Sequence, residues 1–323
     1  MSGESGEKGI STVGQTAQIR DIGSGPLKAT DTRYTRRARY FDSENAFNIN
    51  YPPVPSHSFV SERDQAFEPE TGTALIPLDQ SGAMGLSFPA TTPMVLASYA
   101  RVAAGGTLEH TACASTVCGY VIEGGGRSTQ GGNVIEWHEG DVFCFPGGAP
   151  ITHVSGNTDT VLWLVTNEPQ LAFERFSPPE PNAALVECAH FPAHEIQREL
   201  EVADAKLNAR PSAGLAVVLS TQGLEAIRNI SPTLTLAMNQ LRPGGAQPPH
   251  RHNSVAVSLV VKGPNCYSMI DGARKNWEPW VTVVTPPECV HSHHNDGSDQ
   301  ANWLIVQDGG IHYHCRTMGF SYS

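Results

Sequence analysis

The sequence predicts a mainly all-β protein made of two similar barrels, on the strength of its strand pattern, its turn residues and an internal repeat. Residues 90–168 and 230–323 alternate short β-branched or aromatic runs with Gly, Pro, Asn and Asp. This alternation is typical of short strands joined by tight turns. The 31 Gly and 24 Pro residues of the 323-residue chain are suited to those turns.

The internal repeat relates the two β-rich regions to each other. At an offset of 139, residues 101–124 align with residues 240–263, and further along the chain the offset becomes 140. The repeat therefore indicates a duplicated β-domain. The aligned pairs include Gly105 with Gly244, Gly106 with Gly245, Gly124 with Gly263, Trp137 with Trp277, Pro146 with Pro286 and His153 with His293.

The rest of the chain suggests an arm and a connecting segment. The N-terminal region is Pro-rich and irregular, so we expect it to wrap the barrels as an arm. Apolar residues at helical spacing over residues 193–210 predict one or two short helices that end near Pro211. The expected segments are the arm over residues 1–88, a first barrel over 89–170, a connecting segment with short helices over 171–228 and a second barrel over 229–323.

Charge and hydropathy argue against several classes of protein. The net charge of -11 disfavours nucleic acid or an anionic membrane surface as a partner, because both attract basic patches. No stretch approaches the roughly 20 consecutive apolar residues of a membrane helix, and the polar N-terminus lacks the apolar core of a signal peptide. We therefore expect a cytoplasmic protein with reduced, mostly buried thiols at its cysteines, which are Cys113, Cys118, Cys144, Cys188, Cys266, Cys289 and Cys315.

Three histidines in the second copy have the spacing of a metal site. His250 and His252 are two residues apart, so on a strand both side chains point to the same face, and His291 can reach them from a paired strand. Imidazole nitrogen is a common ligand for first-row transition metals. The pattern therefore predicts one divalent metal ion in the second barrel.

The first copy does not present the same set. In the aligned sequences, Thr111, Cys113 and Ile151 fall at the three ligand positions. A threonine and a cysteine can bind metal, but an isoleucine beside them cannot complete the site. We therefore expect the first barrel to be free of metal.

The order of the second-copy residues resembles the two signature motifs of the cupin superfamily. In that superfamily a Gly followed by His-x-His, and a later His, supply the metal ligands of a jelly-roll barrel. The carboxylate that usually follows the second His by four residues is replaced here by Ala256. The resemblance implies a bicupin with three neutral imidazole ligands and iron(II) as the expected ion, while manganese, nickel and zinc stay open. Such a site favours a chelating anionic or enediol-like substrate together with dioxygen, because the +2 charge is uncompensated.

Within the cupins, the sequence resembles the gentisate and salicylate 1,2-dioxygenase group. The resemblance rests on two cupin domains, on His-Arg-His followed by Ala256, and on Pro286 followed by His291-Ser292-His293, and it covers residues 240–297 in detail. It implies an oxidoreductase of the gentisate or extradiol type that inserts both atoms of dioxygen into a hydroxylated aromatic ring. In that group the residue at the position of His293 is a histidine that contacts the substrate, so we expect His293 to assist proton transfer.

Two departures from the group affect the expected substrate. The group carries its metal in the first barrel, whereas here the complete motif lies in the second. An Arg that helps to hold the substrate carboxylate in the group is replaced by Ser258, which cannot form a bidentate ion pair. The substrate is then either gentisate-like, with its carboxylate held elsewhere, or a hydroquinone-like phenol. The candidate substrate-binding residues are Gln240, Ser258 and Arg101, and Arg242 and Arg251 are further candidate cations.

Other functions compete with this hypothesis, because a fold does not fix chemistry. The alternatives are another metal-dependent cupin activity, such as diketone cleavage, hydroxylation or isomerisation, and a non-catalytic sensor or partner subunit. The expected partners are a small aromatic substrate and dioxygen, in a homo-oligomer or else a hetero-oligomer. Two further motifs favour a structural interpretation: the basic run over residues 32–41 as a solvated or interface face, and residues 312–315 as a terminal strand with both histidines on one face.

Overall fold

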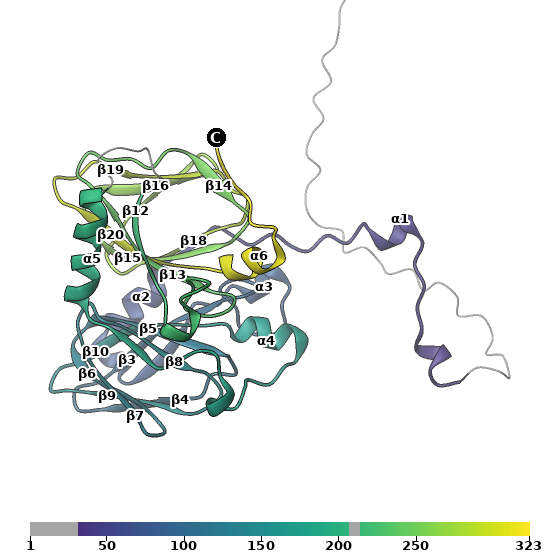
Figure 1. The fold of residues 1–323 in the computed structure, drawn as a ribbon, viewed down its shortest axis with the longest axis horizontal. Coiled ribbons are helices and arrows are strands. Elements are labelled where there is room, and N and C mark those ends of the chain that lie inside the picture. The colour runs from purple at the N-terminus through teal and green to yellow at the C-terminus, as the bar shows by residue number, and fades with distance from the viewer. Residues whose placement is uncertain (1–31, 207–213) are drawn as a thin grey trace, which may run out of the picture. The chain divides into compact units, whose positions relative to one another are not determined.

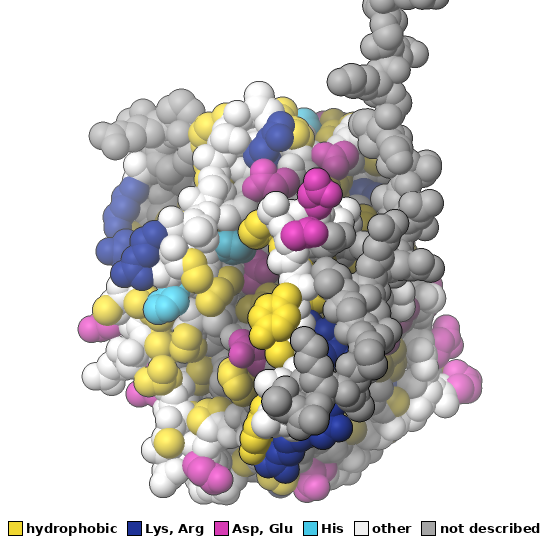
Figure 2. All heavy atoms as spheres, turned by 90° about the vertical axis from the view of Figure 1, so that its right-hand side faces the viewer, with side chains coloured by type: hydrophobic (Ala, Val, Ile, Leu, Met, Phe, Trp, Pro, Cys, Tyr) yellow, Lys and Arg dark blue, Asp and Glu magenta, His cyan; other side chains and the backbone are white. Residues whose placement is uncertain are grey.

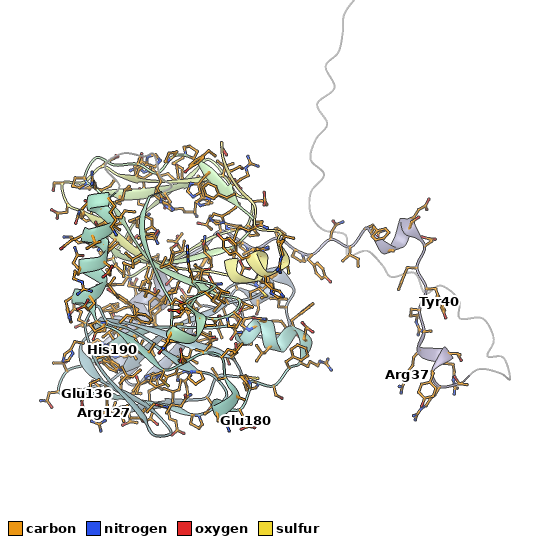
Figure 3. The ribbon with its side chains drawn as sticks, in the orientation of Figure 1. Arg37, Tyr40, Arg127, Glu136, Glu180 and His190 are labelled. Atoms are coloured by element: carbon orange, nitrogen blue, oxygen red, sulfur yellow. The ribbon has the colours of Figure 1, made fainter. Side chains whose placement is uncertain are left out.

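The computed structural model describes residues 32–206 and 214–323, and the chain divides into two units between Pro53 and Val54. In the first unit the basic run forms one turn of 3-10 helix, and the guanidinium of Arg33 lies over the ring of Tyr34, 4.8 Å from its centre. The side chains of Arg37 and Tyr40, labelled in Figure 3, are exposed. The helices of this unit are η1 (Thr35–Arg37) and α1 (Ser43–Ala46).

The second unit contains two barrels, which lie one above the other in Figure 1. The strands of the first barrel are β2 (Ala74–Pro77), β3 (Leu96–Val102), β4 (Thr107–His110), β5 (Thr116–Glu123), β6 (Gly125–Gln130), β7 (Asn133–His138), β8 (Val142–Pro146), β9 (Ile151–Ser155), β10 (Thr160–Thr166) and β11 (Ala189–Phe191). They form a six-stranded sheet in the order β11-β8-β5-β10-β3-β2 and a four-stranded sheet in the order β4-β9-β6-β7.

The second barrel repeats this plan. Its strands are β1 (Ser58–Phe59), β12 (Leu215–Leu219), β13 (Thr235–Leu241), β14 (His250–His252), β15 (Ala256–Lys262), β16 (Cys266–Ile270), β17 (Ala273–Asn276), β18 (Thr282–Thr285), β19 (His291–Asn295), β20 (Ala301–Gln307) and β21 (Phe320–Tyr322). The sheets have the orders β1-β18-β15-β20-β13-β12 and β17-β16-β19-β14-β21. The central strands β5-β10-β3 and β15-β20-β13 correspond, which confirms the duplication expected from the sequence.

Residues 54–88 belong to the barrels' sheets rather than to a separate arm. Ser58 and Phe59 of β1 pair with β18 of the second barrel, and β2 pairs with β3 of the first. Between these two strands, α2 lies against both β2 and β3. The segment that the sequence assigns to the arm therefore contributes a strand to each barrel.

The described helices are few and short. The 14-residue α5 buries Ile196 and Leu200, which confirms a helix in the connecting segment, while its expected end near Pro211 lies outside the described residues. None of the described helices has the length and apolar character to cross a lipid bilayer. The helices of the second unit are α2 (Val60–Phe67), η2 (Pro69–Thr71), α3 (Ser81–Met84), α4 (Glu168–Glu174), η3 (Pro181–Ala183), α5 (Ala193–Lys206), η4 (Gln222–Leu224) and α6 (Gly309–Cys315).

The prediction of a terminal strand at residues 312–315 is wrong, because these residues lie in α6. His312 and His314 are two positions apart on a helix and so cannot share one face. The alternation of apolar and polar residues in this short stretch fits a strand and a helix equally well. The terminal strand is instead β21, which pairs with β14.

The two six-stranded sheets pack against each other, and the largest apolar core lies between them. In β13, Leu236 and Met238 point to this shared core, while Thr235, Ala237 and Asn239 point into the second barrel. Side chains alternate between the two faces of a strand, so each large sheet is buried on both sides. A single barrel would expose an apolar face, and the two barrels therefore stabilise each other.

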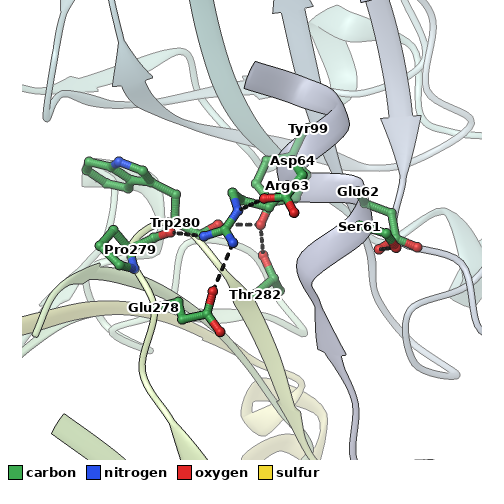
Figure 4. Close-up of polar contacts among 9 residues, drawn as sticks. All are labelled: Ser61, Glu62, Arg63, Asp64, Tyr99, Glu278, Pro279, Trp280 and Thr282. Atoms are coloured by element: carbon green, nitrogen blue, oxygen red, sulfur yellow. Dashed lines mark hydrogen bonds and ion pairs between the residues drawn. The ribbon is translucent and has the colours of Figure 1, made fainter. Parts of the chain in front are cut away.

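Polar contacts also hold the barrels together, as Figure 4 shows. The hydroxyl of Tyr99, on β3 of the first barrel, donates to the carbonyl oxygen of Trp280 and lies 2.9 Å from the hydroxyl of Thr282 in the second. Arg63 of α2 donates to Pro279 O at 2.7 Å and pairs with Glu278 at 3.0 Å. Burial raises the pKa of Tyr99, so this phenol stays protonated and acts as a donor.

We expect Tyr99→Phe to lower the free energy of unfolding by about 1–3 kcal/mol, because it leaves buried polar partners in the second barrel unsatisfied. Urea denaturation measures the change. Tyr120→Phe is the matched control, since Tyr120 is also buried but its hydroxyl forms no hydrogen bond with any described residue. Equal losses in the two variants would contradict a role for the Tyr99 hydroxyl between the barrels.

The seven cysteines are all free, as expected for reduced thiols. Their burial is less general than the sequence suggests, since three are buried, two are partly buried and two are exposed. Cys118 and Cys144 face each other on β5 and β8 with their sulfur atoms 3.8 Å apart. The hydrogen bond with the Cys118 thiol, together with burial, raises the pKa of Cys144, so its thiol stays protonated.

Candidate metal centre

Three imidazoles converge inside the second barrel. His250 of β14 pairs directly with His291 of β19, and His252 lies on the same face of β14 as His250. The ring centres of His250 and His291 are 4.2 Å apart, and those of His252 and His291 are 4.8 Å apart. One nitrogen of each ring lies within 4.8 Å of the corresponding nitrogens of the other two. All three side chains are buried, so the set can surround one ion.

The backbone fixes which nitrogen of each ring is free to bind. Each Nδ1 lies within hydrogen-bonding distance of a carbonyl oxygen, which can only accept. Each neutral ring therefore carries its proton on Nδ1 and keeps the lone pair of Nε2 for a metal. The three bonds run from His250 to Pro248 O at 2.8 Å, from His252 to Ser254 O at 2.7 Å and from His291 to Cys289 O at 2.9 Å.

Burial keeps these rings neutral at physiological pH. Desolvation lowers the pKa of His291 to about 4, with smaller contributions from His250 and His252, and desolvation also lowers the pKa of His252. Protons therefore compete weakly for the Nε2 lone pairs. In the structure the amide nitrogen of Gln307 lies 3.2 Å from Nε2 of His252, close enough to donate a hydrogen bond to it.

The histidines open on a cavity of about 320 Å³, which we call the metal cavity. Among the described residues that line it there is no Asp, Glu, Lys or Arg, so a bound divalent ion would keep most of its positive charge. This donor set fits a first-row transition ion that takes an anionic ligand from solution. The other lining residues are Ala216, Val218, Thr235, Ala237, Asn239, Gln247, Ser254, His293, Trp303, Ile305, Gln307, Tyr313, Met318 and Phe320.

The strand register corrects the ligand positions assigned to the first barrel. His110 of β4 pairs with Ile151 of β9, as His250 pairs with His291. The counterpart of His250 is therefore His110 rather than Thr111, and the counterpart of His252 is Ala112 rather than Cys113. The sequence alignment of the two copies is shifted by one residue here, because the second copy has one more residue between its glycine pair and the ligand strand.

His293 belongs to an arrangement that occurs in both barrels. Its Nδ1 lies 2.7 Å from the hydroxyl oxygen of Ser268, which accepts a hydrogen bond from Nε1 of Trp277 at 2.8 Å. His153, Ser128 and Trp137 make the same contacts at the same distances in the first barrel. The arrangement is thus a feature of the duplicated fold, because it also occurs in the first barrel, which lacks the complete metal motif.

The shared arrangement still fixes the tautomer of His293. Indole N–H can only donate, so the Ser268 oxygen accepts from Trp277. The Ser268 hydroxyl can then donate to Nδ1 of His293, which is its remaining partner among the described residues. The proton of the neutral imidazole consequently lies on Nε2, and His293 lines the metal cavity as a hydrogen-bond donor. Desolvation lowers its pKa well below the usual value.

The structure brings one of the three candidate substrate-binding residues into the barrel. Ser258 lines a small deep pocket of about 10 Å³ next to His293 and Trp303. Gln240 lies on β13 one residue from Asn239, so the pleat turns its side chain away from the cavity. On that opposite face its amide nitrogen donates a hydrogen bond to the side-chain oxygen of Asn302. Arg101 lies in the first barrel and is paired with Asp159.

The further candidate cations also lie outside the cavity. Arg242 pairs with Asp204 of α5, and Arg251 is exposed on the outer face of β14. Asn239 and the C-terminal residues Met318 and Phe320 also line the cavity, although the sequence motifs do not include them. The apolar residues at alternate positions of β13 are a signal that could have placed Asn239 inside the barrel.

Asp308 supports the segment that follows the ligand strand, because its carboxylate accepts a hydrogen bond from the backbone N–H of Val255 at 2.9 Å. Burial raises the pKa of Asp308 from 3.8 to about 6, although the Val255 N–H and the charge of His312 oppose the shift. A raised pKa in the folded state gives stability that is present below about pH 4 and is lost as the pH rises through about 6.

We expect Asp308→Asn to raise the free energy of unfolding at pH 8 by up to about 3 kcal/mol relative to wild type, and to change it little at pH 4. The amide oxygen can still accept from Val255, so only the cost of the buried charge is removed. Denaturant unfolding at the two pH values checks this. A gain that does not depend on pH would contradict the raised pKa.

No family model matches the sequence. Among curated proteins, gentisate 1,2-dioxygenase 1 of Aquipseudomonas alcaligenes is 28% identical over 144 residues, which are 44% of this chain and 39% of that protein. 5-Aminosalicylate 1,2-dioxygenase of a Comamonas species is 40% identical over 87 residues, 26% of this chain and 23% of that protein. The chain therefore matches less than half the length of these relatives.

Solved structures match over most of the chain. Salicylate 1,2-dioxygenase from Pseudaminobacter salicylatoxidans has a TM-score of 0.72 at 15% identity, over 86% of this chain and 91% of that chain. The chain has a bicupin fold. A mutant of the same enzyme in complex with gentisate matches the bicupin with a TM-score of 0.70 at 14% identity, over 86% of this chain and 88% of that chain. The two-barrel cupin architecture expected from the sequence is thus confirmed.

Proposed function

We propose that the chain is an iron(II)-dependent dioxygenase that opens the ring of a hydroxylated aromatic compound. The observation that carries the proposal is the convergence of three Nε2 lone pairs, of His250, His252 and His291, on a cavity whose described lining has no Asp, Glu, Lys or Arg. The likeness to gentisate and salicylate 1,2-dioxygenases in sequence and fold supports the same reaction class. We assign iron rather than manganese, nickel or zinc because of that likeness.

In this proposal the three histidines hold the ion and leave the side that faces the cavity free. When bound, iron(II) supplies the one-electron chemistry that lets dioxygen react with an aromatic ring. The reaction breaks one ring bond and the O–O bond and forms two C–O bonds, so both oxygen atoms enter the product and no reductant is needed. An anionic chelating substrate also compensates the charge that neutral imidazoles leave.

His293 orients the substrate in this proposal by donating a hydrogen bond. Its Nε2–H faces the cavity, where it can donate a hydrogen bond to a hydroxyl or carbonyl oxygen of the substrate. Ser268 and Trp277 act as positioning residues, because they fix the ring and its tautomer. The Gln307 amide is a second donor in the metal cavity and can turn from His252 to a substrate oxygen.

Metal analysis and oxygen uptake test the proposal together. Protein purified without added metal and then loaded anaerobically should bind one iron per chain, and it should consume dioxygen with at least one hydroxylated aromatic acid or hydroquinone. The screen includes gentisate, 5-aminosalicylate, 1-hydroxy-2-naphthoate and hydroquinone, because relatives are named for the first three. Metal binding without oxygen uptake on any of them would favour the non-catalytic alternative, a sensor or a partner subunit.

A cytoplasmic location and a homo-oligomer complete the proposal. The free cysteines fit a reducing compartment. The exposed aromatic residues Phe320 and Tyr322 on the edge strand β21 leave a surface that a second copy can cover. Fractionation and the mass of the assembly in solution check the two statements separately.

A further inference from the structure

A second and larger cavity, of about 750 Å³, lies beside the metal cavity, and we call it the outer pocket. It is bounded by residues 227–235 and by α6. Figure 2 shows the side of the molecule that carries α4 and α6, where Lys and Arg side chains gather at one edge near hydrophobic and histidine side chains. Several lining residues, among them Arg228, Tyr313 and Arg316, are exposed, so the outer pocket is open to ligands from solution.

The two cavities share a wall. Val218, Thr235 and Tyr313 line both the outer pocket and the metal cavity. Tyr313 and Val218 are exposed by 62% and 46%, so the shared wall lies at the surface rather than in the core. A molecule that chelates an ion in the metal cavity can thus extend into the outer pocket.

The outer pocket carries the positive charge that the metal cavity lacks. Arg228 and Arg316 line it, and neither forms an ion pair with any described residue. No Asp or Glu is among the described lining residues. The guanidinium of Arg316 donates one hydrogen bond to the carbonyl oxygen of His314, and its other donors, together with those of Arg228, are available to a carboxylate.

The remainder of the lining mixes apolar and polar side chains. Its apolar residues include Val218, Ile227, Pro232 and Ile311, and its polar residues include Asn229, Thr233 and His314. The apolar residues can bury a hydrocarbon segment between the aromatic ring and the anion. The metal cavity, at about 320 Å³, is in turn of the size that one substituted ring requires.

We infer that the substrate is a hydroxylated aromatic compound with an apolar side arm that ends in a carboxylate, and that Arg228 and Arg316 bind this carboxylate in the outer pocket. The inference rests on the proposed ring-opening function and deepens it by naming the substrate class. It also accounts for Ser258 in the place of an arginine, because a carboxylate at the end of an arm needs no cation beside the metal.

The first barrel provides a matched control for Arg316. Arg316 follows α6 with a φ of 59°, and Arg175 follows α4 in the same left-handed conformation with a φ of 58°. Both arginines are exposed, and Arg175 does not line the outer pocket. Substitution of either by Gln removes one positive charge and leaves the backbone requirement unchanged, so a difference between the two variants reports on the pocket.

The experiment measures dissociation constants by calorimetry on iron(II)-loaded protein under nitrogen. The probes are 2,5-dihydroxyphenyl acids with propanoate, pentanoate and heptanoate arms, each beside the alcohol of the same length. In wild type one acid should bind about tenfold more tightly than its alcohol. The Arg228→Gln, Arg316→Gln double variant should bind that acid and alcohol equally, while Arg175→Gln keeps the preference.

Equal binding of acids and alcohols by wild type, including the case in which a second copy covers the pocket, would overturn the inference. A preference that survives in the double variant would overturn it as well. Failure of the proposed function is separate: if no probe supports oxygen uptake but the acid preference depends on the two arginines, the anion site stands and the ring-opening activity does not.

Discussion

His291→Ala should abolish metal binding and reduce oxygen uptake to the background rate. Loss of a residue that only orients a ligand already costs about 10–100-fold in metal affinity, and loss of a ligand itself costs more. His291 is the one ligand on β19, and the remaining two from β14 cannot surround an ion alone. Iron content by elemental analysis should fall from one equivalent to near zero.

The matched control for this variant is His294→Ala. His294 lies on the same strand, but its ring stacks on Tyr267 at 4.6 Å and it is not part of the converging set. It should keep both the metal and the activity. Metal that stays bound after both His250 and His252 are changed to Ala would show that the ion is held elsewhere.

His293→Ala should lower kcat by about a hundredfold or more while the protein retains its iron, because the variant loses a hydrogen-bond donor to the substrate and keeps all three ligands. The change also leaves the Ser268 hydroxyl without the nitrogen to which it donates, so stability falls at the same time. His293→Gln offers an amide donor in place of the imidazole N–H and should recover part of the loss in kcat.

His153→Ala separates the structural effect from the catalytic one. It removes the same arrangement from the first barrel, where only one of the three ligand positions is a histidine. The two alanine variants should lose similar amounts of stability, but His153→Ala should keep wild-type turnover per folded molecule. Unchanged turnover in His293→Ala would restrict His293 to the structural role that His153 has.

The sequence was sufficient for the fold and for the metal motif because both have a strong local pattern. His250 and His252 are two residues apart on a strand, and the glycine and proline positions around them repeat in the first copy. Spacing alone therefore indicated that both side chains lie on one face of the strand and enter one barrel. The fold comparison confirms the duplicated barrels, and the strand pairing of His250 with His291 is the contact that the motif required.

The side-chain assignments that depended on register could not be obtained in the same way. A shift of one residue turns a strand's side chains to the opposite face. The sequence therefore indicates Gln240 and Thr111 where the structure has Asn239 and His110. Arg101 was a candidate because of its charge, but its partner Asp159 is 58 residues away in the sequence and only tertiary structure joins them. The outer pocket is likewise formed by segments that no local pattern connects.

The most direct test of the central claim is mass spectrometry of the product formed under ¹⁸O₂ by iron-loaded protein, with the hydroxylated aromatic compound that gives the fastest oxygen uptake. The account predicts a ring-opened acid that carries both labelled oxygen atoms, and no such product from His291→Ala. A product with an intact ring would contradict a ring-cleaving dioxygenase at His250, His252 and His291. So would a reaction that needs a reductant and puts one labelled atom into the product while the other leaves as water.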